Sequence, residues 1–175
     1  FYDMNLFAVL VIYNCNIEKS DTLNSLIRNY QRNPEIFRNF ELIIYDNSQL
    51  EQLIGMKTIP FRFQYIHDKD NKGLAVAYNY ALSIAIKNSY NWFLLLDQDS
   101  SLPEDFIDVL FNNFATIDED SNVAAVVAKM RYKKEIFSPT KIYYGGIVRP
   151  IDIQQRGVCA FKNVFAIGSG CVIKS

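Results

Sequence analysis

Two aspartates that directly follow an apolar run have a type and spacing suited to binding a metal ion. Asp97 and Asp99 come after the apolar segment 92–96, with no basic residue between them. Two neighbouring carboxylates repel each other unless a positive charge lies beside them. Mg²⁺ and Mn²⁺ bind through one or two carboxylates and complete their shells with water and phosphate oxygens. The pair therefore predicts a divalent-metal site for a phosphorylated ligand. The alternative is a solvated acidic turn in which Asp99 or Ser101 caps the next helix.

Polar residues also follow two other apolar runs. Tyr13 and Asn14 come after the segment 6–12, and Asp46 closes the segment 41–46. Each of these clusters alone is explained equally well as a turn, because Asn, Asp and Ser favour turns through their own backbone hydrogen bonds. Open α/β sheets, however, bind ligands in the crevice at the carboxyl ends of their strands. Together the three clusters predict one shared site.

The segment 71–79, NKGLAVAYN, has a glycine, Gly73, in the first turn of a predicted helix. Glycine lets a ligand approach the backbone, and helix N-termini attract anions. Neither GxGxxG nor GxxxxGK[ST] occurs, so the alternative is a helix start with a packing glycine. His67, the only histidine, is predicted to be a strand-end residue, because a zinc site would need further histidine or cysteine ligands nearby.

The elements that must position these residues alternate along the chain. Buried strands are predicted at 6–12, 41–46, 62–67, 92–97 and 123–130. Helices are predicted after an N-cap at Asp21 or Thr22 and ending before Pro34, over 71–87, and from Pro103 to Ile117. A β-rich tail follows. This order predicts an open α/β sheet with helices on both faces and with the strand ends gathered along one edge.

Composition predicts one folded domain and excludes several classes of partner. The 175 residues are 50% apolar and 21% charged, with a formal net charge of −1. That balance excludes the broad basic surface that non-specific nucleic-acid binding needs. Three cysteines, Cys15, Cys159 and Cys171, without CxxC spacing predict reduced thiols and a cytoplasmic protein. The apolar run 6–13 is too short to span a membrane.

Four segments in this order, AVLVIYN, ELIIYDNS, DNKGLAVAYNYAL and WFLLLDQDS, resemble the nucleotide-binding half of a family 2 glycosyltransferase of the GT-A fold. WFLLLDQDS is similar to the corresponding strand in the bacterial rhamnosyltransferase-like branch of the family. IGSG at 167–170 resembles the family's acceptor-side SG turn. The resemblance implies a Rossmann-like three-layer α/β/α domain with a mostly parallel central sheet. It implies a single domain over 1–175, with a nucleotide-binding half at about 4–102 and an incomplete acceptor half at about 103–175.

The resemblance also implies roles for particular residues. Those that would bind the nucleotide sugar are Tyr13, Asn14, Asp46, Asn71, Gly73 and Asp97, and Asn79 is a further candidate in the same segment as Asn71. Tyr13, Asn14 and Asp46 would cradle the base and ribose. Asp97 and Asp99 would hold the metal, with Asp99 the more direct ligand. The catalytic base would lie beyond Ser175, so the chain is expected to be a truncated and inactive part of a longer enzyme.

The reaction implied is inverting, metal-dependent transfer of a hexosyl group, rhamnose in this branch. The donor would be a dTDP- or UDP-linked nucleoside diphosphate sugar, and the cofactor Mg²⁺ or Mn²⁺. The acceptor would be a hydroxyl of a cell-surface glycan or lipid-linked glycan in polysaccharide biosynthesis. The resemblance further implies a cytoplasmic protein that associates peripherally with the inner face of the plasma membrane, and no nucleic-acid partner.

Two alternatives remain open at this point. LLLDQDSS also resembles the haloacid-dehalogenase phosphatase motif, in which the first Asp attacks phosphorus and the second is the acid. That family places its motif on the first strand, whereas here about 90 residues precede it. The other alternative is a non-catalytic nucleotide-sugar-binding module. The short chain favours it, and the retained pair of repelling carboxylates argues against it.

Overall fold

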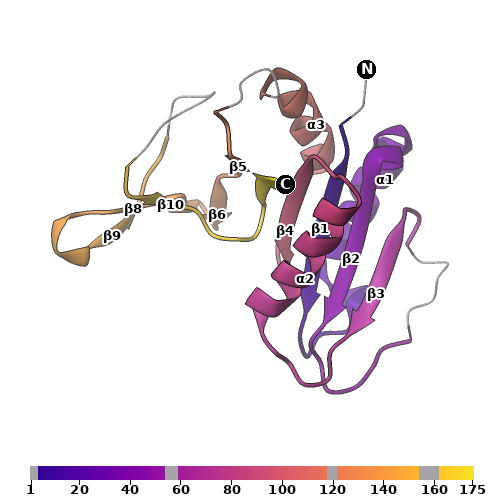
Figure 1. Ribbon diagram of the computed structural model, residues 1–175. Helices are drawn as coiled ribbons and strands as arrows, with labels where there is room; N and C mark the ends of the chain where they lie inside the picture. Colours follow the sequence, from indigo (N-terminus) through magenta and orange to yellow (C-terminus); the bar gives the residue numbers. More distant parts are fainter. Residues whose placement is uncertain (1–3, 54–58, 118–121, 154–161) are drawn as a thin grey trace.

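A six-stranded sheet in the order β3-β2-β1-β4-β11-β5 forms the centre of the molecule (Figure 1). The computed structural model describes residues 4–53, 59–117, 122–153 and 162–175. The strands of the sheet are β1 (Leu6–Ile12), β2 (Phe40–Asp46), β3 (Phe63–His67), β4 (Trp92–Asp97), β5 (Ala125–Val127) and β11 (Cys171–Lys174). β1 to β4 are parallel, and β11 runs antiparallel to β4 and β5. The predicted, mostly parallel sheet is confirmed.

Strand β1 is buried along its whole length, as its uniformly apolar sequence predicts. Successive side chains of a strand point to opposite faces of the sheet. Leu6, Ala8, Leu10 and Ile12 accordingly enter one apolar core, and Phe7, Val9 and Val11 enter another. Two cores require a covering layer on each face.

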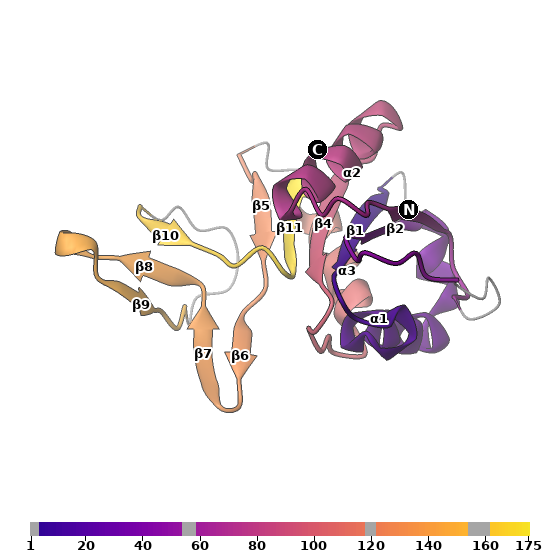
Figure 2. The same cartoon turned by 90° about the horizontal axis from the view of Figure 1, so that it is seen from below.

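Helices supply both layers (Figure 2). α1 (Asp21–Arg32) and α3 (Phe106–Ile117) pack on one face, and α2 (Leu74–Lys87) packs on the other. On the α1/α3 face, the ring of Trp92 stacks on that of Phe114 with centroids 4.5 Å apart. On the other face, only the alanines Ala77, Ala81 and Ala85 of α2 are fully buried. The three-layer α/β/α arrangement is therefore confirmed.

The helices begin later or earlier than their sequence signals predict. Ser20 caps α1, because its Oγ accepts the N–H of Leu23. α2 begins at Leu74, with Gly73 as its cap in an extended positive-φ conformation. α3 begins at Phe106, after a turn in which Pro103 accepts the N–H of Phe106. The apolar period of α2 predicts an inward-facing Leu74, but this side chain is 52% exposed.

The β-rich tail forms an extension that projects from the α/β body (Figures 1 and 2). A two-stranded ribbon pairs β6 (Met130–Tyr132) with β7 (Glu135–Ser138). A three-stranded sheet has the order β10-β8-β9, from β8 (Thr140–Ile142), β9 (Val148–Pro150) and β10 (Val164–Phe165). The predicted strand 123–130 is thus divided between two strands. β5 ends at Val127 in the main sheet, and β6 begins at Met130 in the ribbon.

Short 3₁₀ turns connect several of these elements. They are η1 (Ile17–Lys19), η2 (Pro34–Asn39) and η3 (Tyr144–Gly146). Cys15 and Cys171 are free thiols, and Cys159 lies outside the described residues. No helix among the residues that the structure describes combines the length and apolarity needed to cross a bilayer.

Candidate functional site

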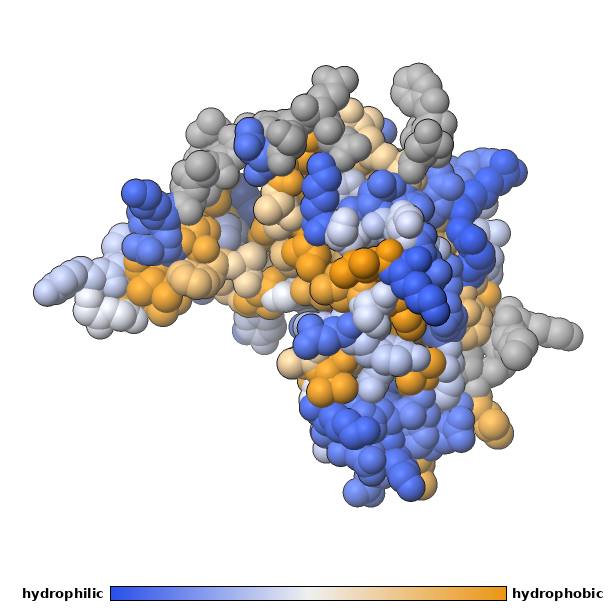
Figure 3. Space-filling view, viewed as in Figure 1, coloured by the Kyte–Doolittle hydropathy of each residue, from blue (hydrophilic) through white to orange (hydrophobic). Residues whose placement is uncertain are grey.

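The carboxyl ends of the four parallel strands are joined to one another by hydrogen bonds. The N–H of Tyr13, after β1, donates to Oε1 of Gln98, after β4, at 2.8 Å. The N–H of Asn14 donates to Oγ of Ser48, after β2, at 3.0 Å. The predicted clusters therefore meet at one edge of the sheet, as parallel strands require. Figure 3 shows hydrophilic side chains gathered at the end of the body where β2 and β3 of Figure 1 terminate.

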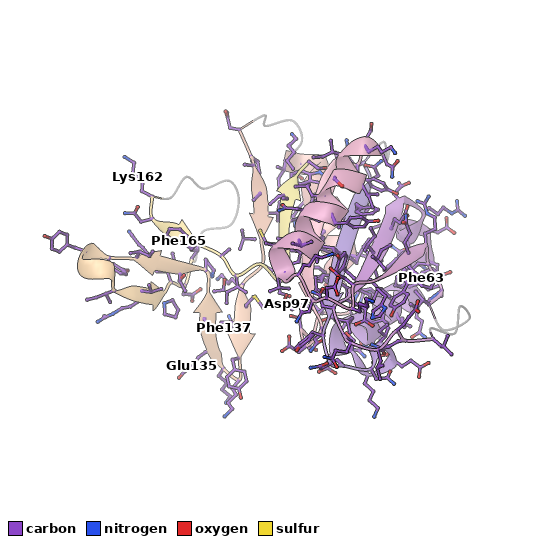
Figure 4. All side chains as sticks on the ribbon, turned by 60° about the horizontal axis from the view of Figure 1, so that its bottom comes forward. Phe63, Asp97, Glu135, Phe137, Lys162 and Phe165 are labelled. Atoms are coloured by element: carbon purple, nitrogen blue, oxygen red, sulfur yellow. The ribbon has the colours of Figure 1, made fainter. Side chains whose placement is uncertain are left out.

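Asp97 lies at this edge, where the body meets the extension (Figure 4). The hydroxyl of Tyr78, on α2, donates to Oδ1 of Asp97 at 3.0 Å. The backbone N–H of Asp97 donates to Oγ of Ser169 at 3.1 Å, and its carbonyl accepts the hydroxyl of Thr22. Both the backbone and the side chain of Asp97 are thus fixed by other elements.

Burial, together with the charge and hydrogen bond of Asp97, raises the pKa of Tyr78 well above its usual value. Burial disfavours the charged phenolate, and the neighbouring carboxylate disfavours it further. The hydroxyl therefore stays protonated near neutral pH and donates to Asp97.

The loop after Asp97 is held by further hydroxyl groups. Oγ of Ser20 donates to the carbonyl of Gln98 at 2.7 Å. The N–H of Ser100 donates to Oγ1 of Thr22 at 2.9 Å. The start of α1 thus supports the backbone of the loop that carries both predicted metal ligands.

Asp99 is exposed, in contrast to Asp97. Within the described ranges, no hydrogen bond or ion pair holds its carboxylate, and no group of three or more His, Cys, Asp or Glu side chains could hold a metal. A half-buried carboxylate and an exposed one two positions along are a donor set that suits Mg²⁺ or Mn²⁺, which complete their shells with water and phosphate oxygens. The residues present therefore fit a divalent cation that a ligand helps to coordinate.

Asp46 is fully buried, and protein groups already use both of its carboxylate oxygens. Oδ1 accepts the N–H of Ser48 at 2.9 Å. Oδ2 accepts the amide of Gln52 and the hydroxyl of Tyr65, each at 2.9 Å. A ligand would have to displace Gln52 or Tyr65 to touch this carboxylate. Asp46 anchors the loop after β2.

A cavity of about 290 Å³ opens at the same edge of the sheet. Its lining residues are Asn16, Ile17, Glu18, Gln52 and Leu53. Neither Asp97 nor Asp99 lines it. Nearby, Asn47 is buried, and its Oδ1 has no hydrogen-bond partner among the described atoms. A buried amide oxygen without a partner is costly unless a ligand or water supplies a donor.

Asp68 follows β3 and is hydrogen-bonded much as Asp46 is. Its Oδ2 accepts the hydroxyl of Tyr45 at 3.0 Å, and its Oδ1 lies 3.8 Å from Nζ of Lys72. Burial raises the pKa of Asp68, but the bonds from Tyr45 and Asp70 and the charge of Lys72 outweigh it, so the pKa lies below its usual value. Asp68 therefore remains an anion at neutral pH. Nε2 of His67 donates to the carbonyl of Ser48 at 2.8 Å.

Asn71 and Gly73 lie in the turn that leads from β3 into α2. Asn71 has a φ of 45° and donates its N–H to the carbonyl of Asp68. Gly73 has φ 90° and ψ 172°, and no atom lies within 4 Å of where its Cβ would be. Only glycine adopts this conformation readily, and it leaves the backbone open to a ligand. Asn79 is exposed on α2.

Tyr78, Gln98 and Ser169 hold the site together, and their sequence signals predict none of these roles. Tyr78 occupies a position in the apolar period of α2, so its sequence signal is that of a packing residue. Ser169 belongs to the IGSG segment, which is notable in the sequence only through a family resemblance. Their roles depend on contacts across the fold, which periodicity does not encode.

The profile of the family described as Glycosyl transferase family 2 matches residues 8–174. Among curated proteins, none matches the chain. The chain is also similar to solved structures. Residues 1–349 of S. aureus TarS superpose with a TM-score of 0.56 at 19% identity, over 81% of this chain and 40% of that chain. The same protein in complex with UDP-GlcNAc gives 0.52 at 21% identity, over 73% of this chain and 35% of that one.

A mannosyltransferase of Pyrobaculum calidifontis, PcManGT, in complex with GDP-Man and Mn²⁺ superposes with a TM-score of 0.52 at 17% identity. That match covers 74% of this chain and 36% of the mannosyltransferase. The chain thus spans well under half of the length of these proteins. At such identities the likeness shows a shared fold, and it agrees with the GT-A architecture of a mixed α/β domain with a mostly parallel sheet.

Proposed function

The chain belongs to glycosyl transferase family 2, and from that premise we propose that it binds a nucleoside diphosphate sugar for transfer of the sugar to a hydroxyl group. The observation that carries the proposal is the difference between the two aspartates at the end of β4, one held by the protein and one exposed. Asp97 is fixed through Oδ1 by Tyr78, while Asp99 is exposed beside it. A rigid carboxylate next to an open one suits a cation that is shared with a diphosphate.

We assign the metal to Asp99 and Asp97, with Mg²⁺ or Mn²⁺ as the ion. When bound, the ion would supply Lewis-acid neutralisation of the diphosphate leaving group. Asp97 would bind the ion, while Tyr78 holds its carboxylate and Ser169 holds its backbone N–H. The complex of the structurally similar mannosyltransferase with GDP-Man and Mn²⁺ supports this assignment.

The nucleotide is proposed to lie along the edge of the sheet from β3 to β4. Tyr13 and Asn14 are exposed there and would contact the base and ribose. Gly73 would let the donor approach the start of α2, beside Asn71. Asp46 would contribute indirectly, by holding the loop that carries Ser48 and Gln52. Complexes of TarS with UDP-GlcNAc and of PcManGT with GDP-Man support a nucleotide-sugar donor.

The finer parts of the proposal follow from the family resemblance, and the rhamnose donor follows from WFLLLDQDS in particular. They are a rhamnose donor linked to dTDP or UDP, inversion at the anomeric carbon, and a cell-surface or lipid-linked glycan acceptor at the cytoplasmic face of the membrane. We assign about 4–102 to the donor side and about 103–175 to the acceptor side. β11 joins these two parts, because it pairs with β4 of the donor side.

Calorimetric titration of the chain with UDP, dTDP and GDP, each with and without Mn²⁺, tests the proposal. We expect one diphosphate to bind at micromolar concentration and its affinity to rise with Mn²⁺. Asp99→Asn should abolish the rise, because it removes a charged ligand of the ion. Asp105→Asn is the matched control, since Asp105 is an exposed aspartate six positions further along the chain.

Equal loss of the Mn²⁺ effect in both variants would mean a general charge effect rather than a metal site. Binding of no diphosphate under any condition would refute the proposed function. The phosphatase alternative has lost its basis, because the chain belongs to a glycosyltransferase family. The non-catalytic module differs from the proposal only in turnover, which an assay with the donor that binds would decide.

A further inference from the structure

Tyrosine hydroxyls hold three of the carboxylates that follow the parallel strands. Tyr65 donates to Asp46 at 2.9 Å, and Tyr45 donates to Asp68 at 3.0 Å. Tyr78 donates to Asp97 at 3.0 Å. Of the three tyrosines, Tyr78 alone comes from a helix, and its partner is the carboxylate next to the exposed Asp99.

The hydrogen bond from Tyr78 makes the two oxygens of Asp97 unequal. Oδ1 accepts the phenol, whereas no described residue donates to Oδ2. Rotation of the Asp97 carboxylate would break its hydrogen bond with the phenol. That bond has a charged acceptor, and such bonds are stronger than those between neutral groups. The phenol therefore favours one orientation of the carboxylate before any ligand arrives.

The backbone of Asp97 is fixed independently of this bond. Ser169 accepts its N–H at 3.1 Å, and Thr22 donates to its carbonyl. Removing the hydroxyl of Tyr78 would thus free the side chain of Asp97 while the loop keeps its path. The ring of Tyr78 is partly buried against the core on the α2 face, so a phenylalanine would retain its packing.

We propose that Tyr78 is a positioning residue, which orients the Asp97 carboxylate so that Oδ2 faces the shared cation and nucleotide. The metal-binding part of this inference rests on the proposed function, whereas the orientation of Asp97 does not. Tyr78 itself does not touch the ion in this assignment. Its contribution is to reduce the number of orientations that the carboxylate must lose on binding.

The test is Tyr78→Phe, with two measurements on the same chain. The first is a crystal structure of each protein, which shows whether Asp97 keeps one orientation. The second is the ratio of diphosphate affinity with Mn²⁺ to that without it, measured by calorimetry. We expect Asp97 to turn or to occupy several orientations in the variant. We expect the affinity ratio to fall by up to about tenfold, the cost of ordering one side chain on binding, with little change in metal-free affinity.

Tyr90→Phe is the matched control. Tyr90 also donates to a carboxylate, Oε2 of Glu41 at 2.6 Å, but it lies at the opposite end of the sheet, before β4 begins. Loss of that bond should leave the affinity ratio unchanged. A general loss of stability would lower both affinities and the melting temperature in either variant, and so would not mimic the expected change of ratio.

An unchanged Asp97 orientation in Tyr78→Phe would overturn the inference, whatever nucleotide the protein binds. An unchanged affinity ratio with a reoriented Asp97 would overturn the link between orientation and the metal. If the wild-type chain bound no diphosphate, the proposed function would fail, and the crystal structures alone would still decide whether Tyr78 orients Asp97.

Discussion

The hydroxyls of Ser169 and Ser100 lie 2.8 Å apart and join the turn before β11 to the loop after β4. Ser169 is almost completely buried, and its Oγ also accepts the N–H of Asp97. The loop that carries the two candidate metal ligands is therefore completed by a residue 72 positions away from Asp97. The turn before β11 thus supports the loop after β4.

Ser169→Ala should destabilise the fold and weaken nucleotide binding. It leaves the N–H of Asp97 without its acceptor, which costs about 1–3 kcal/mol for a buried group. Urea denaturation measures this loss. Ser83→Ala removes a hydroxyl that donates to the carbonyl of Tyr80 on the exposed side of α2, and is expected to change stability by less than about 0.5 kcal/mol. Similar losses in the two variants would contradict the role given to Ser169.

Gly73→Ala should cost stability through the backbone alone. Gly73 has φ 90° and ψ 172°, and its Cβ would meet nothing within 4 Å. The expected loss is about 1–3 kcal/mol, the strain of a non-glycine residue in this conformation. Gly168→Ala is the comparison, because its Cβ would make an ordinary contact 3.8 Å from Oη of Tyr78 without a positive φ. Thermal unfolding of both variants should show a clear loss at Gly73 only.

Alkaline titration should reveal the half-buried hydroxyl of Tyr65, which donates to Asp46. Burial raises its pKa to about 12, with the Asp46 carboxylate adding to the rise and the N–H of Gln52 opposing it. Because the folded pKa lies above the unfolded value of about 10, this stabilisation is complete below pH 10. It is then lost as the pH rises from about 10 to about 12.

The measurement for Tyr65 is the ultraviolet absorbance of phenolate against pH. Tyr65→Phe should reduce the amplitude of the step near pH 12 by the contribution of one tyrosine. If Tyr65→Phe left the late step unchanged, the hydroxyl of Tyr65 would not be held against Asp46 as the structure shows.

Phe114→Ala should strongly destabilise the core between α3 and the sheet. Phe114 is fully buried and stacks on Trp92. Truncating a buried phenylalanine costs about 3–5 kcal/mol, since it removes apolar burial and leaves a cavity. Val109→Ala on the same helix is the control, because Val109 is 46% exposed. Denaturant unfolding that gave equal losses would show that α3 does not pack as described.

The strands could be predicted from the sequence because burial on both faces leaves an uninterrupted apolar run. The predicted strands 6–12 and 92–97 agree with β1 and β4 residue for residue. The predicted strand 123–130 was too long, because β5 lies at the sheet edge and exposes Ala125 and Val127, so burial does not fix its ends. The tail was predicted to be β-rich, but no local signal indicates that β11 inserts between β4 and β5.

The meeting of the strand-end clusters could also be predicted, because parallel strands bring their carboxyl ends to one edge. The chemistry around each aspartate could not. Asp46 and Asp97 look alike in the sequence, as each closes an apolar strand. The structure makes Asp46 a buried anchor and leaves one oxygen of Asp97 without a described donor. The difference comes from Gln52, Tyr65 and Tyr78, whose sequence signals are those of loop and packing residues.

The insertion of β11 between β4 and β5 has a consequence for synthesis on the ribosome. β4, with its sequence WFLLLD, emerges about 70 residues before its partner Cys171–Lys174. At about 5–20 residues per second, the nascent chain carries an unpaired apolar strand edge for several seconds. Exposed edges of this kind pair readily with other chains. Chains released before β11 is made are therefore expected to aggregate rather than to yield a smaller folded domain.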